Sequence, residues 1–118
     1  MPDFERELKR GILELVLLRL LSARPKYGYE LVQELRTSAG EVLEVKEGTL
    51  YPVLYRLEEQ SLISPQWQTG KRGVPRKYYE LTAEGESRLA ELRGIWIRFA
   101  SCVTDLVADA EDDHEVGR

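Results

Sequence analysis

Residues 47–58, EGTLYPVLYRLE, decide the fold that this sequence predicts. Apolar side chains recur in this stretch at i, i+3, i+4 and i+7, which is the pattern of a helix with one buried face. The buried set comprises Leu50, Val53, Leu54 and Leu57. The opposite side presents Gly48, Pro52, Tyr55 and Glu59, with Thr49, Tyr51 and Arg56 on its flanks. Such a surface is thin, aromatic and partly basic, so we expect it to enter a groove.

A basic hairpin is predicted directly after this helix. Residues 62–68 and 76–81 are two β-prone runs, separated by a loop with two glycines and a proline. The expected inward face consists of Ile63, Trp67, Tyr79 and Leu81. The tip has four cations and no acid, namely Lys71, Arg72, Arg76 and Lys77. A helix followed by a basic hairpin is the layout of a winged helix, so double-stranded DNA is the first partner to consider.

Two further helices are predicted before this unit, at residues 5–23 and 27–38. One face of the first helix is marked by Leu8, Ile12, Leu15, Val16 and Leu20. Its apolar surface is widened by Leu13, Leu17, Leu18 and Leu21, so other elements must cover it on several sides. Gly40 is expected to end the second helix, and residues 41–45 to form a short connection with β character.

The last predicted helix, residues 83–108, follows Thr82 as its N-cap. Its apolar residues are spaced 3, 4, 3, 4, 3, as in a coiled coil, and form a seam of Leu89, Leu92, Trp96, Phe99, Val103 and Leu106. Ile95 and Cys102 widen this seam by one row, and we expect Cys102 to be buried and inert. A small domain cannot cover six seam positions alone, so the pattern predicts a homodimer.

The fold class is therefore mainly α with a small β-hairpin, namely a winged helix-turn-helix plus a C-terminal dimerisation helix. We expect residues 1–82 to form the DNA-binding domain, 83–108 the dimerisation helix, and 109–118 an acidic, disordered tail. A chain of 118 residues with 42% hydrophobic and 32% charged residues is typical of one soluble globular domain. No run is long and apolar enough for a membrane span, and we expect no secretory signal. The single cysteine fits a reducing, cytoplasmic location.

The net charge of −4 does not exclude a nucleic-acid partner, because the acids are concentrated at one end. The last fourteen residues have a charge of −5, whereas residues 1–104 have a charge of +1. DNA affinity depends on local clusters of cations that displace counterions, not on the sum over the chain.

Enzymatic chemistry has little support in this sequence. The only histidine, His114, lies in the acidic tail, and the chain has no phosphate-binding loop and no nucleophile placed beside a base. We therefore expect neither catalytic residues nor a cofactor or metal ion.

Several motifs together closely resemble the PadR family of bacterial transcriptional regulators. They are Tyr27-Gly28-Tyr29-Glu30-Leu31, Glu47-Gly48-Thr49-Leu50-Tyr51-Pro52, Arg56-Leu57-Glu58, Leu62-Ile63, Trp67, and Pro75-Arg76-Lys77-Tyr78-Tyr79-Glu80-Leu81-Thr82. The resemblance extends from about Leu8 to the start of the last helix, and the single C-terminal helix is similar to the smaller branch of the family. One departure is Gln60-Ser61, where the family usually has a glycine in the turn before the wing.

The resemblance implies a dimeric winged helix that represses its target gene until a signal, such as a small molecule, lowers its affinity for the operator. In a winged helix the third helix lies in the major groove. The expected DNA contacts of this helix are Lys46, Gly48, Thr49, Tyr51, Pro52, Tyr55 and Arg56, and those of the wing are Lys71, Arg72, Arg76 and Lys77. For Arg56 the alternative is an intrahelical pair with Gln60 or Glu59, or a cap on the core. Trp96 and Phe99 either pack in the dimer core or line an effector pocket between subunits.

A rival function belongs to another class. A winged helix that has lost DNA binding can act as a protein-interaction adaptor, with its basic wing meeting an acidic partner. The retained groove-facing residues of the third helix and the cationic wing argue against this alternative.

Overall fold

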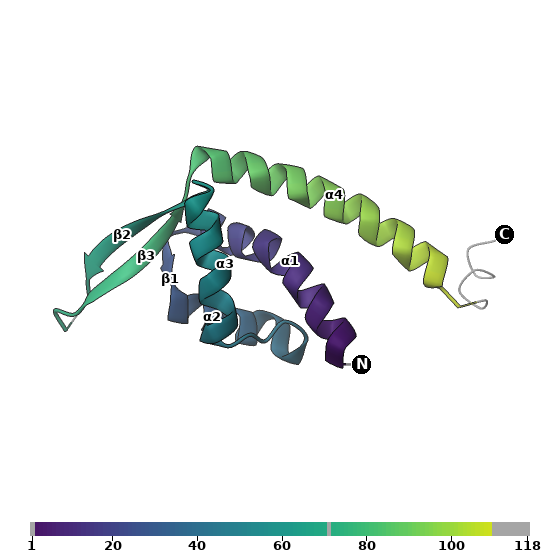
Figure 1. The fold of residues 1–118 in the computed structure, drawn as a ribbon, viewed down its shortest axis with the longest axis horizontal. Coiled ribbons are helices and arrows are strands. Elements are labelled where there is room, and N and C mark those ends of the chain that lie inside the picture. Colours follow the sequence, from purple (N-terminus) through teal and green to yellow (C-terminus); the bar gives the residue numbers. More distant parts are fainter. Residues whose placement is uncertain (1, 71, 110–118) are drawn as a thin grey trace.

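The computed structural model describes residues 2–70 and 72–109, so Lys71 and the tail beyond Asp109, including His114, lie outside the described residues (Figure 1). The elements follow the order α1 (Pro2–Ala23), β1 (Lys26–Tyr27), α2 (Gly28–Ala39), the 3-10 helix η1 (Gly40–Val42), α3 (Glu47–Glu59), β2 (Ile63–Thr69), β3 (Pro75–Leu81) and α4 (Ala83–Val107). The predicted fold class, mainly α with a small β-hairpin, is confirmed, and β1 adds a third strand to the hairpin. In the described residues, no helix combines the length and apolarity needed to cross a membrane.

The core lies where α1, α2 and α3 meet the base of the hairpin (Figure 1). The four predicted core positions of α3 are all buried, as are Leu31, Val32 and Leu35 of α2. Because the apolar period of each helix matches the helical repeat, one face of each is turned to the others.

The most deeply buried side of α1 is not the one that the predicted face marks. Its core positions are Leu13, Leu17, Leu18 and Leu21, the residues that were expected only to widen the stripe. Of the predicted face, Leu15, Val16 and Leu20 are partly buried against the core, whereas Leu8 is exposed. Ile12 and Leu15 also line a small cavity with α4. The helix is apolar on both sides, so its sequence pattern alone could not show which side meets α2 and α3.

Residues 24–45 contain a strand that was not predicted, and the expected β character of one connection is absent from them. The strand β1 has only two residues, too short for any periodicity, and pairs with β3 through Lys26↔Tyr79 and Tyr27↔Tyr78. The buried Lys26 ammonium lies 2.6 Å from a carboxylate oxygen of Glu34. The expected β character of residues 41–45 is wrong, because residues 40–42 form a 3-10 turn instead.

The sheet has the order β1-β3-β2, and both pairings are antiparallel. Residues that face each other across an antiparallel pair lie on the same side of the sheet. The pairs Ile63↔Leu81 and Trp67↔Lys77 therefore place Trp67 on the predicted inward side. Its predicted burial is nevertheless wrong, since Trp67 is 68% exposed. The described part of the hairpin extends beyond the helices, so none of these helices lies over its outer half (Figure 1).

The helix α4 begins as predicted, with the Gly85 N–H donating to Thr82 Oγ1 at 3.0 Å. It then leaves the body on the side away from the wing tip (Figure 1). Its 25 residues correspond to a length of about 37 Å. Its N-terminal part packs on the core, through Gly85, Leu89 and the partly buried Leu92.

Candidate nucleic-acid interface

The outward face of α3 has the composition expected from the sequence. Its exposed residues include Lys46, Gly48, Thr49, Pro52, Tyr55 and Arg56. Lys46 is the extended residue that precedes the helix, and Glu47 in the first turn suits the positive end of the helix dipole. The structure therefore brings six of the seven predicted recognition residues to one solvent-exposed surface.

Pro52 changes the hydrogen bonding of this surface. It lies inside α3, about one and a half turns from the start of the helix. Proline has no N–H, so the carbonyl of Gly48, four residues earlier, receives no helical hydrogen bond from position 52. The exposed Gly48 thus presents an acceptor beside the Pro52 ring.

Tyr51 is the recognition residue that is half-buried. Its ring lies 5.9 Å from the ring of Tyr55, between centroids. A Cβ at Gly28 would come within 3.0 Å of three atoms at the end of the Tyr51 side chain, so glycine is what lets Tyr51 lie against the start of α2. Burial, followed by the charge of Glu47 and the nearby Tyr55, raises the pKa of Tyr51 above its ordinary value. The hydroxyl is therefore a neutral group at pH 7.

Two wing cations are held by aromatic rings and one acid. The Arg76 guanidinium lies 4.5 Å from the ring centroid of Tyr27. Lys77 is half-buried, pairs with Glu58 of α3 at 3.3 Å, and lies 5.6 Å from the ring centroid of Tyr55. Burial alone would lower the pKa of Lys77, but its interactions with Glu58 and Tyr79 together outweigh that effect and raise the pKa. Lys77 is thus a cation that joins the wing to α3, whereas Arg72 and Arg76 are exposed.

The wing and α3 enclose a cavity of about 450 Å³. No acid lines it; the lining residues are Tyr27, Gly28, Tyr29, Tyr51, Tyr55, Arg76, Lys77 and Tyr79. Tyr27 and Tyr29 were not among the predicted site residues, although both belong to the motif Tyr27-Gly28-Tyr29-Glu30-Leu31. Their position next to the recognition helix depends on the short strand β1, which the sequence pattern did not reveal.

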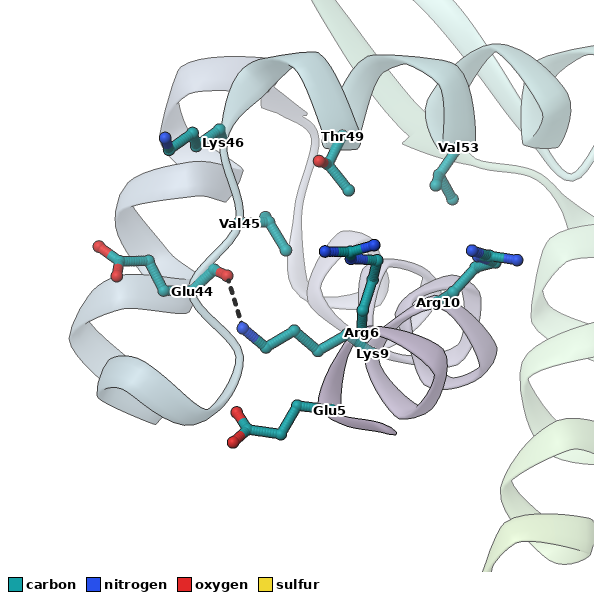
Figure 2. Close-up of a pocket in the computed structure, with 9 residues that line it drawn as sticks. All are labelled: Glu5, Arg6, Lys9, Arg10, Glu44, Val45, Lys46, Thr49 and Val53. Carbon is teal, nitrogen blue, oxygen red and sulfur yellow. Dashed lines mark hydrogen bonds between the residues drawn. The ribbon is translucent and has the colours of Figure 1, made fainter. Parts of the chain in front are cut away.

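A second cavity, of about 550 Å³, lies on the other flank of α3, between this helix and α1 (Figure 2). Its cations are Arg6, Lys9, Arg10 and Lys46. Only Lys46 was a predicted site residue. The i, i+4 spacing of Arg6 and Arg10 indicates in the sequence that these two cations lie on the same side of a helix.

The predicted seam of α4 is covered only at its beginning. Leu89 is buried and Leu92 is partly buried, whereas exposure reaches 63% at Phe99 and 79% at Leu106. Cys102 is exposed in this chain, so its predicted burial is wrong for the single protomer. Trp96 and Phe99 both line a cavity of about 160 Å³ against α1, and Trp96 also lines one of about 470 Å³ with Leu8 and Leu43. Within residues 2–70 and 72–109, no three His, Cys, Asp or Glu side chains are grouped as metal ligands.

Comparison with known proteins places these features in one family. The model of the PadR-like family of transcriptional regulators matches residues 17–91, more than half of the chain. The chain is 37% identical over 90 residues to an uncharacterised protein of Lysinibacillus sphaericus, with 76% of this chain and 83% of that protein covered. It is 34% identical over 88 residues to a transcriptional regulator of Mycobacterium tuberculosis, with 75% and 78% covered.

A solved structure supports the same assignment over nearly the whole chain. The PadR family transcriptional regulator of Eggerthella lenta superimposes with a TM-score of 0.78 at 36% identity, covering 90% of each chain. The winged helix, the motif residues and these matches agree, so this chain belongs to the PadR-like family of transcriptional regulators.

Proposed function

We propose that this protein is a homodimeric regulator that binds a specific double-stranded DNA operator and represses transcription there. The observation that supports it best is the exposed face of α3 beside the wing cavity, whose lining contains five tyrosines, two cations and no acid. A helix of this kind can enter the major groove, while phosphate contacts from the wing fix its register.

Base recognition is assigned to the outward residues of α3. Thr49 and Tyr55 provide hydroxyl groups, and the Gly48 carbonyl provides an acceptor for an amino group of adenine or cytosine. Pro52 provides an apolar surface for a thymine methyl group. Tyr51 supports Tyr55 from the side, with the hydroxyl end of its ring packed against Gly28.

Phosphate contacts are assigned to Lys46, Lys71, Arg72 and Arg76. These cations contribute affinity without reading sequence, because a phosphate is the same at every step. Lys77 is assigned a different role because it pairs with Glu58. This ion pair holds the wing at a fixed angle to α3.

Dimerisation is assigned to the exposed apolar side of α4 together with the uncovered side of α1. Single exposed apolar residues are common on protein surfaces, but a continuous apolar side indicates an interface. The exposed members include Phe4, Leu8, Ile95, Trp96, Phe99, Val103 and Leu106. A second copy would cover both helices and place two recognition helices on one operator.

An effector site is proposed at Trp96, where two cavities adjoin the dimer side of α1 and α4. A flat aromatic molecule between subunits would stack on this indole and change the separation of the recognition helices. Quenching of tryptophan fluorescence by acridine, measured without DNA, tests this site. Quenching should persist in Trp67→Ala and disappear in Trp96→Ala; equal quenching of both variants would refute the site.

A mobility-shift titration on the DNA upstream of the protein's own gene tests the main proposal. If each dimer displaces counterions from about eight phosphates, log K should fall with log salt at a slope near −7. Arg72→Ala should weaken binding to all sequences equally, whereas Thr49→Ala should also reduce the preference for the operator over random DNA. Binding with no salt dependence, or none at all, would favour the adaptor function instead.

A further inference from the structure

The ring of Tyr51 in α3 lies directly against Gly28, the first residue of α2. A Cβ at Gly28 would lie 2.2 Å from the Tyr51 hydroxyl oxygen, 2.5 Å from Cζ and 2.8 Å from Cε1. Cβ atoms in proteins do not come within 3.0 Å of other heavy atoms in this way, so any residue larger than glycine would displace the ring. Both residues line the wing cavity, beside the outward face of the recognition helix.

The backbone conformation does not require a glycine at position 28. Among the described residues, the glycines with a positive φ are Gly40 and Gly73, so Gly28 has a conformation that other residues adopt. Alanine also has a higher helix propensity than glycine. The space that Tyr51 occupies is therefore what excludes a side chain at this position.

The backbones on both sides of this contact are fixed. Tyr27, which precedes Gly28, belongs to β1 and is paired with β3 in the sheet. On the other side, Leu50 precedes Tyr51 and is fully buried in the core, which anchors α3. A Cβ at Gly28 would meet the far end of the Tyr51 side chain, so the ring would rotate while both backbones keep their positions.

The position of the Tyr51 ring also affects Tyr55. The two ring centroids are 5.9 Å apart, and the Tyr55 ring centroid lies 5.6 Å from the Lys77 ammonium of the wing. Tyr55 is 52% exposed, so these two neighbours hold its ring more than burial does. A rotated Tyr51 would either press against Tyr55 or leave a gap beside it. Both changes shift the Tyr55 hydroxyl.

We propose that Gly28 determines the sequence preference for the operator, because it lets Tyr51 hold Tyr55 in position for base recognition. This inference rests on the proposed DNA-binding function, in which the Tyr55 hydroxyl contacts a base. Base readout depends on hydrogen-bond geometry at the base edges, and a displaced hydroxyl loses that geometry. Gly28 is thus a positioning residue for sequence readout, and the phosphate contacts of the wing do not depend on it.

Gly28→Ala tests the proposal on the duplex that the wild-type protein selects from a random-sequence library. The preference for this duplex over random DNA should fall about tenfold, which is the order of one lost base contact. The slope of log K against log salt should keep its wild-type value, because no cation is removed. Gly11→Ala is the matched control and should keep the preference, since a Cβ at that helical glycine would point into open space.

A double-mutant cycle determines whether the effect passes through Tyr51. Tyr51→Leu removes the three atoms that a Cβ at Gly28 would meet and also the ring that supports Tyr55, so it should lower the preference by itself. Gly28→Ala should have no further effect in the Tyr51→Leu protein. Tyr51→Phe should retain most of the preference, because the ring remains beside Tyr55.

Thermal unfolding separates positioning from folding. Because a side-chain rotation relieves the contact, Gly28→Ala should lower the midpoint of unfolding by less than about 5 °C. A partly unfolded variant would lose affinity for all duplexes alike. A loss confined to the selected duplex therefore does not arise from instability.

The possible failures are distinguishable. If Gly28→Ala keeps the wild-type preference, or lowers it equally with and without Tyr51→Leu, the positioning role is refuted and the proposed function stands. If Gly28→Ala unfolds the protein at the assay temperature, the contact is a requirement of the fold, and the positioning role is refuted as well. If the wild-type protein selects no duplex, the proposed function fails and this inference fails with it.

Discussion

At the scale of single residues, Ser61 is the position where the backbone conformation conflicts most with the side chain. Its φ is 61°, in the left-handed region that favours glycine. The turn closes with two hydrogen bonds of 3.0 Å, from the Ser61 N–H to the Glu58 carbonyl and from the Leu62 N–H to the Leu57 carbonyl. This pair of bonds is the Schellman motif, which ends α3 and aims the chain into the wing.

Ser61→Gly should raise the free energy of unfolding by about 0.5–1 kcal/mol, because glycine adopts this φ without steric cost. Urea unfolding at a fixed protein concentration measures the change. Ser61→Ala is the matched control, since it removes the same hydroxyl but keeps the Cβ. If both variants were equally stable, strain at this φ would not be the cause.

Sequence periodicity predicted burial correctly for residues whose burial depends on a single helix. The four core positions of α3 follow from its period, and all four are buried. It failed at Trp67 and Cys102, which lie on the expected sides of their elements but beyond the part that the body covers. Periodicity gives the direction of a side chain, whereas exposure also depends on how far an element extends past its neighbours.

At the scale of elements, Gly85 at the start of α4 takes part in both the helix cap and a close packing contact. Gly85 donates its N–H to the Thr82 cap, and its Cα packs against the chain that enters the wing. A Cβ here would lie less than 3.0 Å from the Leu62 carbonyl oxygen and from Leu81 Cδ1. The same Leu62 carbonyl accepts the Thr82 N–H at 3.1 Å, so it has little freedom to move.

Gly85→Ala should therefore destabilise the protein by about 1–3 kcal/mol, the usual cost of overpacking. Gly94→Ala on the same helix should instead stabilise it by about 0.5–1 kcal/mol, because its Cβ would meet only Arg98 Nη1, at an ordinary 3.6 Å. Thermal unfolding of both variants gives the comparison. Equal effects at the two positions would show that helix propensity, not contact with Leu62, explains Gly85.

Elements with a clear period were predicted to within a few residues, and those without one were not. The ends of α3, the hairpin strands and α4 lie close to their expected positions because caps and turns mark them. The two-residue strand β1 exists only through its pairing with β3, which is a long-range contact. The same limit applies to the candidate site. The cations of α1 lie beside α3 because of tertiary packing, which the sequence pattern does not show.

At the scale of the whole molecule, one protomer leaves much of its apolar surface uncovered. The core of the winged helix is complete without the second half of α4, whose apolar residues remain exposed. The sequence predicted the seam but could not show how much of it the chain covers by itself. The proposed dimer accounts for this surface and doubles the number of phosphate contacts.

Phe99→Glu should make the protein a folded monomer, since a carboxylate cannot be buried in an apolar interface and Phe99 is outside the winged-helix core. Ile97→Glu is the matched control; both residues are exposed in the protomer, but they point about 160° apart around α4. Sedimentation equilibrium at micromolar concentration should find a dimer for the wild-type protein and Ile97→Glu, and a monomer for Phe99→Glu. The monomer should bind DNA with about half the wild-type salt slope, because it displaces counterions from one half-site only. A monomeric wild-type protein would contradict the proposed assembly, and an unchanged slope in Phe99→Glu would show that the two half-sites do not act together.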